Sequence, residues 1–483
     1  MLSSRLPKDL SPSQFFAELE RVKACAKKDA AEGGLSFIDM TVSSPVKAGL
    51  PIDLDAAVEE TRKDFGCWNP DAAGWKSARD AVVEYYHERG GNFTAGQIIL
   101  TASTSEAYSV LFKTFCDPGD VILTPMPGYP LLDTLAQLEH LECAPYFLKL
   151  RRENARRLAT DERREISAKS DVILSGAINE TSYFSSLVEL CPLGKNPVKS
   201  GFRFVLDSDS LLAAPEKAKI LLLVSPHNPT GHCVSREEWN AAVRFCEEND
   251  MILVIDEVFG DYGFSPEVRR SWEYVLDERR DIRHSGLCPV VDVIPYGETR
   301  DERNMWDAGG NDFVNLPEDG PKCPIFWLNG LSKAVGSPQI KLGWMAFYAP
   351  RERFEEIRAA LEFVEDAYLS VSAPAQALGI SLLPKAAAYE SRVKERLLRN
   401  WQTLREAFPS KYCPEVLGGW YAVVRLGEDD EELTLRLLKE KHVLVQPGFF
   451  FDFDEDGWVV VSLLQEPAQF KEAVARMRAL AQG

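Results

Sequence analysis

Short runs of apolar, often β-branched residues alternate with longer segments of helical periodicity through the middle of the chain, and this pattern limits the fold more than any other feature of the sequence. Segments such as SEAYSVLFKTFC and SREEWNAAVRFCEEND separate several of the runs. Strands that alternate with helices in this way predict an α/β domain with a mostly parallel sheet. The predicted strands are residues 97–101, 120–124, 219–225, 251–257, 325–330 and 344–348.

The pattern changes after Pro350. Helical segments dominate up to Phe408, and three apolar runs, GGWYAVVRL, HVLVQPG and GWVVVSLL, then predict a smaller sheet. Two stretches, 151–200 and 266–322, are polar and weakly periodic, and we interpret them as insertions. The predicted organisation is an N-terminal segment that joins the small domain, a large central domain and a small α+β domain, with bounds 1–55, 56–350 and 351–483.

The composition favours a soluble cytoplasmic protein and argues against two classes of partner. The formal net charge is −19, whereas general affinity for nucleic acid or anionic membranes needs a basic surface. No apolar run has the length of a membrane span, and the start MLSSRLPKDLSPSQFF lacks the apolar core of a secretory signal. The ten cysteines are scattered without a C-x-x-C motif or a metal-binding cluster at zinc spacing, which is typical of a reducing compartment.

Three polar residues follow successive predicted strands. Asn228 comes after KILLLVS, Asp256 ends MILVID, and Lys333 comes after IFWLNG. In open α/β sheets, ligands bind beyond the carboxyl ends of the strands, so the three side chains are expected to meet at one edge. Taken singly, each has an ordinary explanation, namely a turn, a helix cap or surface charge, and a solvated loop lysine. Their order at successive strand ends favours a shared site.

The chemistry of these side chains fits one cofactor, pyridoxal 5′-phosphate. A partly desolvated lysine has a lowered pKa and forms a Schiff base with a carbonyl group. An ionised carboxylate beside a pyridine nitrogen favours the protonated ring and strengthens it as an electron sink. An amide can hydrogen-bond the phenolic oxygen of the same ring. The sequence therefore predicts Lys333 and Asp256 as catalytic residues and Asn228 as a cofactor contact.

Further residues are placed to complete such a site. The segment ILTASTSEAY runs from a strand into a helix, whose free N–H groups bind anions, so Ser103 and Thr104 are the natural phosphate contacts, with Ser332 as a further hydroxyl. Lys341 could add a positive charge at the phosphate, and Tyr129, in PMPGYP, could stack on the pyridine ring. The alternatives are a helix that is merely capped, a solvated lysine and an ordinary core or interface tyrosine.

Motifs spread over most of the chain extend this interpretation. They are DMTVSSP, WNPDAAGWKSARDAVVEYY, LTASTSEAY, PMPGYP, SPHNPTG, VIDEVF, GLSKAVGSPQIKLGW and PGFFFDFDEDGWVVVSL. As an ordered set they resemble the class I/II aminotransferases, which are pyridoxal-phosphate enzymes of fold type I. The resemblance implies that Lys333 carries the Schiff base and moves the proton between the substrate Cα and the cofactor. It also implies that Asp256 pairs with the pyridine nitrogen, Asn228 with the phenolic oxygen, and that Tyr129 stacks on the ring of a homodimeric enzyme.

Four positions depart from the pattern of this family. Phe259 stands where a tyrosine usually bonds the phenolic oxygen, and Trp68 stands where a tyrosine usually reaches the phosphate of the partner subunit. Lys341 replaces an arginine, which keeps the charge and loses the bidentate fork. Val460, in GWVVVSL, occupies the position of the arginine that grips the substrate α-carboxylate, and a valine cannot take that role.

The predicted insertions could supply a substitute for this arginine. We expect a replacement cation from them if the substrate is an α-amino acid, although the sequence does not single out one residue. The candidates include Arg151, Arg152, Arg269, Arg270 and Arg283.

The leading interpretation of function is an aminotransferase that moves an amino group between an amino acid and a 2-oxo acid. A first alternative keeps the cofactor and changes the reaction to that of a lyase, a decarboxylase or an enzyme acting on amines without an α-carboxylate. A second alternative is a non-catalytic binding or regulatory protein on the same scaffold. Retention of Lys333 and Asp256 argues against the second, as does the lack of an appended basic DNA-binding segment.

Overall fold

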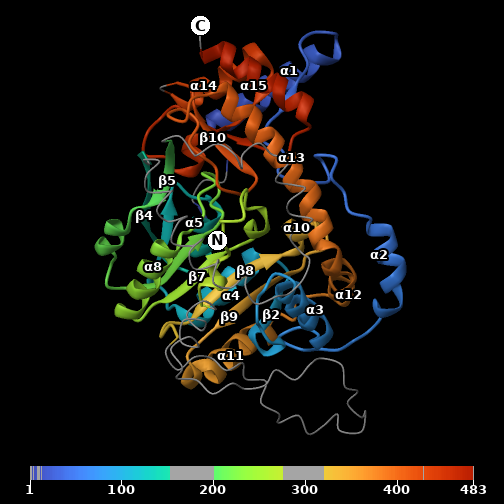
Figure 1. Cartoon of the computed structure of the whole chain (residues 1–483), viewed down its shortest axis with the longest axis vertical. Helices are drawn as coiled ribbons and strands as arrows, with labels where there is room; N and C mark the ends of the chain where they lie inside the picture. Colours follow the sequence, from blue (N-terminus) through green and yellow to red (C-terminus); the bar gives the residue numbers. More distant parts are fainter. Residues whose placement is uncertain are drawn as a thin grey trace, which may run out of the picture.

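The computed structural model describes residues 13–152, 201–275, 320–427 and 429–481, with Ser3, Ser11 and 5–7 near the N-terminus. An eight-stranded sheet lies at its centre, in the order β2-β9-β8-β7-β6-β3-β4-β5 (Figure 1). The strands are β2 (Ile98–Thr101), β3 (Val121–Met126), β4 (Glu142–Arg152), β5 (Phe202–Leu206), β6 (Ala218–Val224), β7 (Ile252–Asp256), β8 (Ile325–Gly330) and β9 (Gly343–Tyr348). Strands β9 and β5 run antiparallel to their neighbours, and the remaining pairs are parallel.

The six strands predicted for this sheet are confirmed as β2, β3, β6, β7, β8 and β9. The sequence did not predict β4 and β5. Strand β4 exposes much of its length, so polar residues interrupt its apolar pattern, unlike the fully buried strands. Its outer end pairs with β5, with Arg152 opposite Phe202. The first predicted insertion, 151–200, therefore departs from the end of this hairpin, and residues 153–200 lie outside the described residues.

Both faces of the large sheet are covered by helices, which explains why its central strands are apolar throughout. Consecutive residues of a strand point to opposite faces, so Val254 belongs to one buried cluster and Ile255 to another. The first face packs against α4 (Thr104–Phe115), α5 (Leu131–Leu138) and α11 (Arg351–Asp366), and the second packs against α3 (Lys76–His87) and α8 (Arg236–Glu248).

A three-stranded antiparallel sheet forms from the C-terminal part of the chain, as predicted. Its order is β10 (Tyr421–Arg425), β13 (Trp458–Ser462) and β12 (Gln446–Pro447). The N-terminal segment lies beside it, because α1 (Gln14–Ala31) packs against α14 (Asp430–Lys441) and β1 (Ile38–Asp39) pairs with β11 (Val443–Leu444). Figure 1 shows the long helix α13 (Ala386–Ala407) reaching from the side of the large sheet to the three-stranded sheet and its helices. There α13 packs against α15 (Pro467–Ala481).

The predicted helices between residues 351 and 408 are confirmed as α11, α12 (Ala373–Leu382) and α13. Two of them contact the helices of the large sheet, since α11 packs against α4, and α12 packs against α3 and α2 (Leu54–Thr61). The domain bounds themselves stay a prediction.

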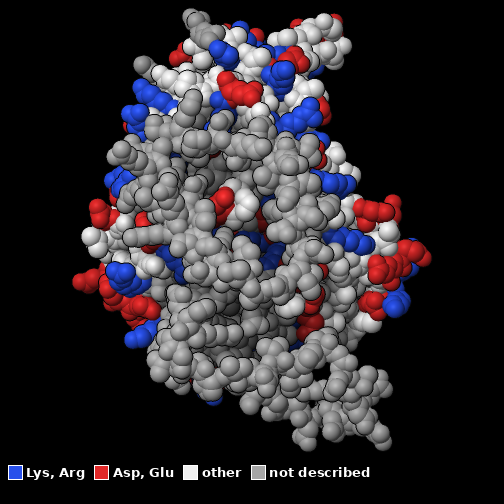
Figure 2. Space-filling model, viewed as in Figure 1, with Lys and Arg blue, Asp and Glu red and all other residues white. Residues whose placement is uncertain are grey.

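The described surface carries mixed charge. On the face seen in Figure 2, acidic and basic side chains are intermingled around the rim, over the C-terminal helices and along both sides. None of the helices that the structure describes is long and apolar enough to cross a membrane.

Candidate active site

The three strand-end residues lie at one edge of the large sheet. Asp256 is the last residue of β7 and pairs with Val224 of β6 on one side and Leu328 of β8 on the other. Asn228 follows β6, and Lys333 lies in the short helix α10 (Leu331–Ala334), directly after β8. Because these strands are parallel neighbours, the three residues lie at the same edge of the sheet, beyond the carboxyl ends of the strands.

Lys333 lies among aromatic rings. Its Nζ lies 4.8 Å from the ring centroid of Trp420 and 5.4 Å from that of Phe259. Burial lowers the pKa of Lys333 to about 8, and the negative charge of Asp256 opposes this shift. The Tyr262 hydroxyl donates to the Lys333 carbonyl oxygen at 2.7 Å and fixes the backbone there. A lysine in this environment is not an ordinary solvated charge, and its neutral amine is accessible to chemistry near physiological pH.

The Asp256 carboxylate is held by donors on two elements. Its Oδ2 accepts from the Tyr108 hydroxyl of α4 at 2.6 Å, and its Oδ1 accepts from the backbone N–H of Val258 at 3.0 Å. Burial raises the pKa of Asp256, whereas the bonds from Tyr108 and Val258 and the charge of Lys333 act in the opposite direction. Asp256 is thus a fixed, partly desolvated acid directed toward the sheet edge.

Asn228 carries an unused polar atom. Its Oδ1 is buried and has no hydrogen-bond partner among the described residues. A half-turn of the amide exchanges this oxygen for the NH2 group, so the position suits a ligand with either an acceptor or a donor. The loop is fixed by its neighbour His227, whose Nδ1 lies 2.9 Å from Thr230 Oγ1 and whose N–H donates to the His232 carbonyl oxygen. Burial, reinforced by His232, lowers the pKa of His227 to about 3, so this ring is neutral.

The predicted phosphate residues gather at the start of α4. Ser103 caps this helix, its Oγ accepting from the Glu106 N–H, and Thr104 is the first helical residue. Gly343 of β9 lies against them, since a Cβ there would stand 3.0 Å from Ser103 C and 3.1 Å from Thr104 N. Lys341 precedes this contact in a left-handed conformation with φ 61°, and its side chain is exposed.

The same glycine joins the phosphate segment to the lysine turn. A Cβ on Gly330 would lie 3.0 Å from the Gly343 Cα, and the Leu331 N–H donates to the Leu342 carbonyl oxygen at 3.0 Å. The start of α4, the segment after Lys341 and the turn that contains Ser332 therefore adjoin one another. Free N–H groups at a helix start favour an anion in this place.

Tyr129 lies beyond β3 on the same edge. Its side chain is 47% exposed, and its loop is tied to the C-terminal part of the chain by the Gly128 N–H, which donates to the Phe451 carbonyl oxygen at 2.8 Å. Burial and, to a smaller extent, the negative charge of Asp256 raise the pKa of Tyr129.

Three positions that depart from the family pattern have distinct surroundings. Phe259 is buried and packs on Trp420, with 5.4 Å between ring centroids, so an apolar contact replaces a hydroxyl. Trp68 is 81% exposed. Val460 is fully buried in β13, opposite Val423 of β10 and Gln446 of β12. The position of the expected carboxylate anchor is therefore neutral and packed.

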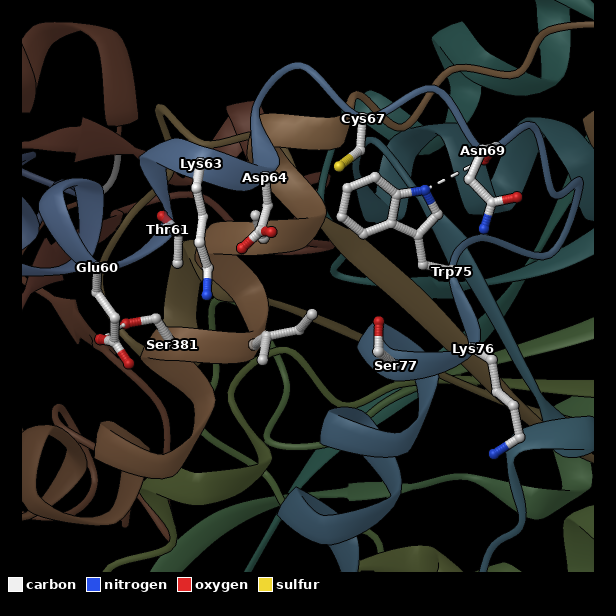
Figure 3. Close-up of a pocket in the computed structure, with 12 residues that line it drawn as sticks. Glu60, Thr61, Lys63, Asp64, Cys67, Asn69, Trp75, Lys76, Ser77 and Ser381 are labelled. Carbon is white, nitrogen blue, oxygen red and sulfur yellow. Dashed lines mark hydrogen bonds between the residues drawn. The ribbon is translucent and has the colours of Figure 1, made fainter. Parts of the chain in front are cut away.

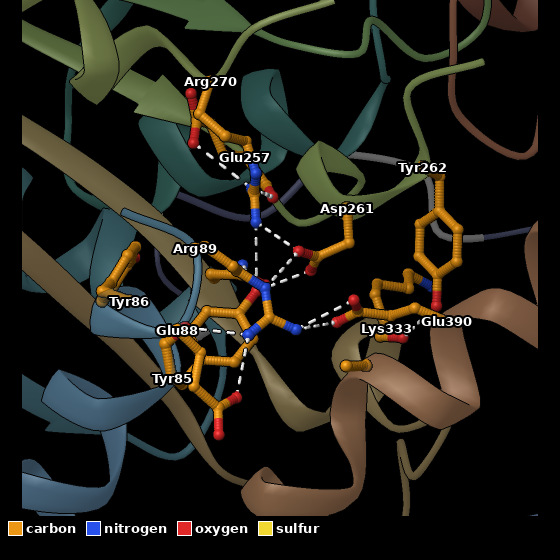
Figure 4. Close-up of polar contacts among 12 residues, drawn as sticks. Tyr85, Tyr86, Glu88, Arg89, Glu257, Asp261, Tyr262, Arg270, Lys333 and Glu390 are labelled. Carbon is orange, nitrogen blue, oxygen red and sulfur yellow. Dashed lines mark hydrogen bonds and ion pairs between the residues drawn. The ribbon is translucent and has the colours of Figure 1, made fainter. Parts of the chain in front are cut away.

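Three of the five named insertion arginines are already paired. Arg151 donates to Asp207 at 3.2 Å and Arg269 to Glu273 at 2.9 Å. Arg270 lies in a buried network, where it donates to Asp261 at 2.5 Å and to the Tyr85 hydroxyl at 3.1 Å (Figure 4). Arg152 is exposed, and Arg283 lies outside the described residues.

The buried network around Arg270 borders the lysine turn. Figure 4 shows Arg89 and Arg270 converging on Asp261, with Glu390 completing the pairing of Arg89. Tyr262, the residue after Asp261, donates a hydrogen bond from its hydroxyl to the Lys333 carbonyl oxygen.

A cavity lies apart from the strand-end residues. Its volume is about 600 Å³, and it opens between the segment 60–77 and α12 (Figure 3). Trp75 lines it, and its Nε1 donates to the Asn69 carbonyl oxygen at 3.1 Å. Its lining does not include Lys333 or Asp256, so the cavity does not mark the strand-end site.

Three residues of the strand-end site were not predicted from the sequence: Tyr108, Tyr262 and Trp420. Tyr108 had a detectable signal, because it lies one helical turn after Thr104 on the helix already assigned to the phosphate. Tyr262 and Trp420 gave none, since their contacts with Lys333 depend on how distant segments pack.

Solved aminotransferase structures share this fold. An aminotransferase from Escherichia coli matches with a TM-score of 0.68 at 17% identity, covering 100% of this chain and 98% of that chain. An alanine aminotransferase from Pyrococcus furiosus matches with a TM-score of 0.67 at 19% identity, covering 98% and 100%. The predicted fold class, a fold-type-I transferase with a mostly parallel sheet, is confirmed.

Sequence comparison gives the family. The family model described as "Aminotransferase class I and II" matches residues 53–477. Glutamate-pyruvate aminotransferase AlaA of Haemophilus influenzae is 20% identical over 463 residues, covering 92% of this chain and 91% of the relative. Alanine aminotransferase of Mycobacterium tuberculosis is 23% identical over 397 residues, covering 79% and 71%. The chain belongs to the class I and II aminotransferase family, whose members use pyridoxal phosphate, and the predicted assignment to the transaminases is confirmed.

Proposed function

We propose that the strand-end site binds pyridoxal 5′-phosphate and serves transfer of an amino group between an amino acid and a 2-oxo acid. The observation that supports this most strongly is Lys333 itself. With a pKa of about 8, roughly a tenth of its amine is uncharged at pH 7, whereas a solvated lysine is almost wholly protonated. A carboxylate and an amide stand at the adjoining strand ends, as the cofactor requires.

The residues present fit this group. Lys333, Asp256 and Asn228 all retain partial exposure, although the segments around them are largely buried. The buried amide oxygen of Asn228 has no partner among the described residues. The start of α4 offers backbone N–H groups and the hydroxyls of Ser103 and Thr104 to a phosphate. Tyr108, which donates to Asp256, lies one helical turn further along the same helix.

Each residue would have a defined task. The bound cofactor supplies an electron sink for the electron pair left at the substrate Cα. Lys333 Nζ would then take up and return the proton at that carbon, and Asp256 would hold a proton on the pyridine nitrogen. Tyr129 would cover one face of the ring, and Ser103 and Thr104 would hold the phosphate.

The relatives named above are alanine and glutamate-pyruvate aminotransferases, so α-amino acids are the first candidates. Because Val460 cannot bind a carboxylate, we propose that another cation does so. Arg270 is held in a buried network with Asp261, so the anchor would be a different residue. Of the arginines named from the sequence, Arg152 and Arg283 remain, together with Arg151 and Arg269, whose ion pairs are partly solvated.

A half-reaction screen tests the proposed function. The purified enzyme, loaded with pyridoxal phosphate, is mixed with single amino acids and with the matching decarboxylated amines, and the absorbance and products are followed. We expect pyridoxamine phosphate and a 2-oxo acid from at least one amino acid, and poor reaction with the amines. Carbon dioxide release or an elimination product without pyridoxamine phosphate would contradict transamination. Equal rates with amines would instead favour a substrate that lacks the α-carboxylate.

We also propose a homodimer in the cytoplasm, with domains bounded near residues 55 and 350. The eight described cysteines are all free, which supports a reducing compartment. Pairing of β1 with β11 supports the assignment of the N-terminal segment to the small domain. Trp68 is 81% exposed and stands where members of the family carry a tyrosine that reaches the partner subunit, which supports an interface at this position.

Replacing Trp68 with glutamate is expected to weaken the dimer, because an ionised carboxylate would have to be buried on association. Sedimentation velocity over a concentration series should show at least a tenfold higher dissociation constant, about 1.4 kcal/mol. Leu212, which is 82% exposed on a different element, provides the matched control when it is replaced with glutamate. A monomeric wild-type protein, or equal effects of both variants, would contradict this interface.

A further inference from the structure

Helix α4 contacts the proposed cofactor site at two places. Its first residues, Ser103 and Thr104, lie where the phosphate would bind, and Tyr108 follows one turn later. At a rise of about 1.5 Å per residue, Thr104 and Tyr108 are about 6 Å apart along the helix axis. The same rigid element therefore reaches both the phosphate end and the acid at the opposite end of the ring.

The Tyr108 hydroxyl contacts the acid directly. It donates to Asp256 Oδ2 at 2.6 Å, across 148 residues of sequence, and its side chain is only 4% exposed. A hydroxyl that donates to a carboxylate favours the ionised form and fixes the direction of its oxygens. The other oxygen, Oδ1, accepts from the Val258 N–H, so the carboxylate is clamped from a helix and from its own loop.

We propose that Tyr108 is a positioning residue for the transamination reaction, and that its hydroxyl keeps the Asp256 carboxylate ionised and directed at the pyridine nitrogen. The inference rests on the proposed function, because it assigns a role toward the same cofactor. Other titratable groups that act on Asp256 are Lys333, from α10, and Tyr129, from the loop after β3. Unlike Lys333 and Tyr129, Tyr108 donates a hydrogen bond to the Asp256 carboxylate.

A purely structural role of Tyr108 predicts different behaviour. The ring packs against Phe112, with 6.1 Å between centroids, and a phenylalanine would keep that contact. Tyr108→Phe therefore removes the hydroxyl alone. If the hydroxyl keeps Asp256 ionised and oriented, this variant will lower the pKa of the ring nitrogen. It will also slow proton removal from the substrate, with little change in substrate affinity.

The test uses the intact protein loaded with pyridoxal phosphate labelled with ¹⁵N in the ring. We expect the ring nitrogen of the Tyr108→Phe variant to lose its proton at a pH about one unit lower than in wild type, a tenfold change in the equilibrium, as for one charge-assisted hydrogen bond. The value of kcat should fall by about tenfold and KM by less than twofold.

Tyr146→Phe is the matched control. Tyr146 is 2% exposed and donates to the Leu222 carbonyl oxygen at 2.9 Å, so its variant loses a buried hydroxyl without touching Asp256. In an Asp256→Asn background, Tyr108→Phe should cause little further loss, since the two residues act as a unit.

An unchanged ring-nitrogen titration in Tyr108→Phe, an equal change in Tyr146→Phe, or full additivity with Asp256→Asn would overturn the inference. Wild-type protein that takes up no cofactor would overturn the proposed function itself. The two failures are therefore distinguishable.

Discussion

Replacing Lys333 with alanine is expected to abolish transamination and the visible absorbance of the Schiff base, because the covalent bond to the cofactor needs this amine. Turnover should fall by at least about a thousandfold. Borohydride reduction of the wild type, followed by peptide mass spectrometry, should place the adduct on Lys333. The Lys333→Arg variant keeps a cation and should be equally inactive, whereas Lys341→Ala should keep the adduct. An adduct on another lysine would show that the assignment is wrong.

The same amine gives this prediction a pH dependence. Only the neutral form attacks a carbonyl group, so the rate of Schiff-base formation by cofactor-free protein should rise with pH around a midpoint of about 8, below the ordinary value of 10.5. The negative charge of Asp256 raises the pKa of Lys333, so Asp256→Asn should move this midpoint to lower pH. Stopped-flow absorbance measures both. A midpoint near 10.5 would show that Lys333 is solvated.

Replacing Arg270 with alanine is expected to destabilise the fold by about 3–5 kcal/mol, because it leaves the buried Glu257 carboxylate without its counter-charge and leaves Asp261 with Arg89 alone. The side chain of Arg270 is 9% exposed, and those of its partners Asp261 and Glu257 are 3% and 2% exposed. Denaturant unfolding of the purified variant measures the change in free energy of unfolding.

Arg269 is the matched control. It belongs to the same predicted insertion, but its ion pair with Glu273 is partly solvated, at 26% and 30% exposure. Its loss should cost about 0–1 kcal/mol. If Arg270→Ala leaves stability unchanged and raises KM for amino acids selectively, then Arg270 binds substrate and its assignment to the network is wrong.

The central sheet was predictable because its strands are buried on both faces. Val254 and Ile255 pack into different clusters, so the whole run reads as apolar and contrasts with the polar helices around it. Strand β4 lacked that contrast, because only one side of much of its length is covered. Prediction from apolar runs therefore finds the central strands of the sheet and misses β4, which is partly exposed.

The site residues that could be predicted are those whose location depends only on the strand at whose end they lie. Lys333, Asp256 and Asn228 follow consecutive strands of the sheet, and parallel neighbours end at a common edge. Trp420 directly precedes β10 of the small sheet, and its contact with Lys333 depends on how this segment packs against the large sheet. No local pattern specifies such a contact.

The β4–β5 hairpin has a consequence for how this enzyme can diversify. Strand β4 continues past the end of its parallel neighbour, where Met126 meets Phe147, and its last residue, Arg152, faces Phe202 across the hairpin. The chain thus departs and returns at adjacent points on the catalytic edge of the sheet. In many proteins, a loop of about two to five residues joins the two strands of a β-hairpin. A loop of that length would be enough to connect β4 to β5. Selection can therefore lengthen, shorten or rewrite the intervening segment without moving the strands that position Lys333, Asp256 and Asn228.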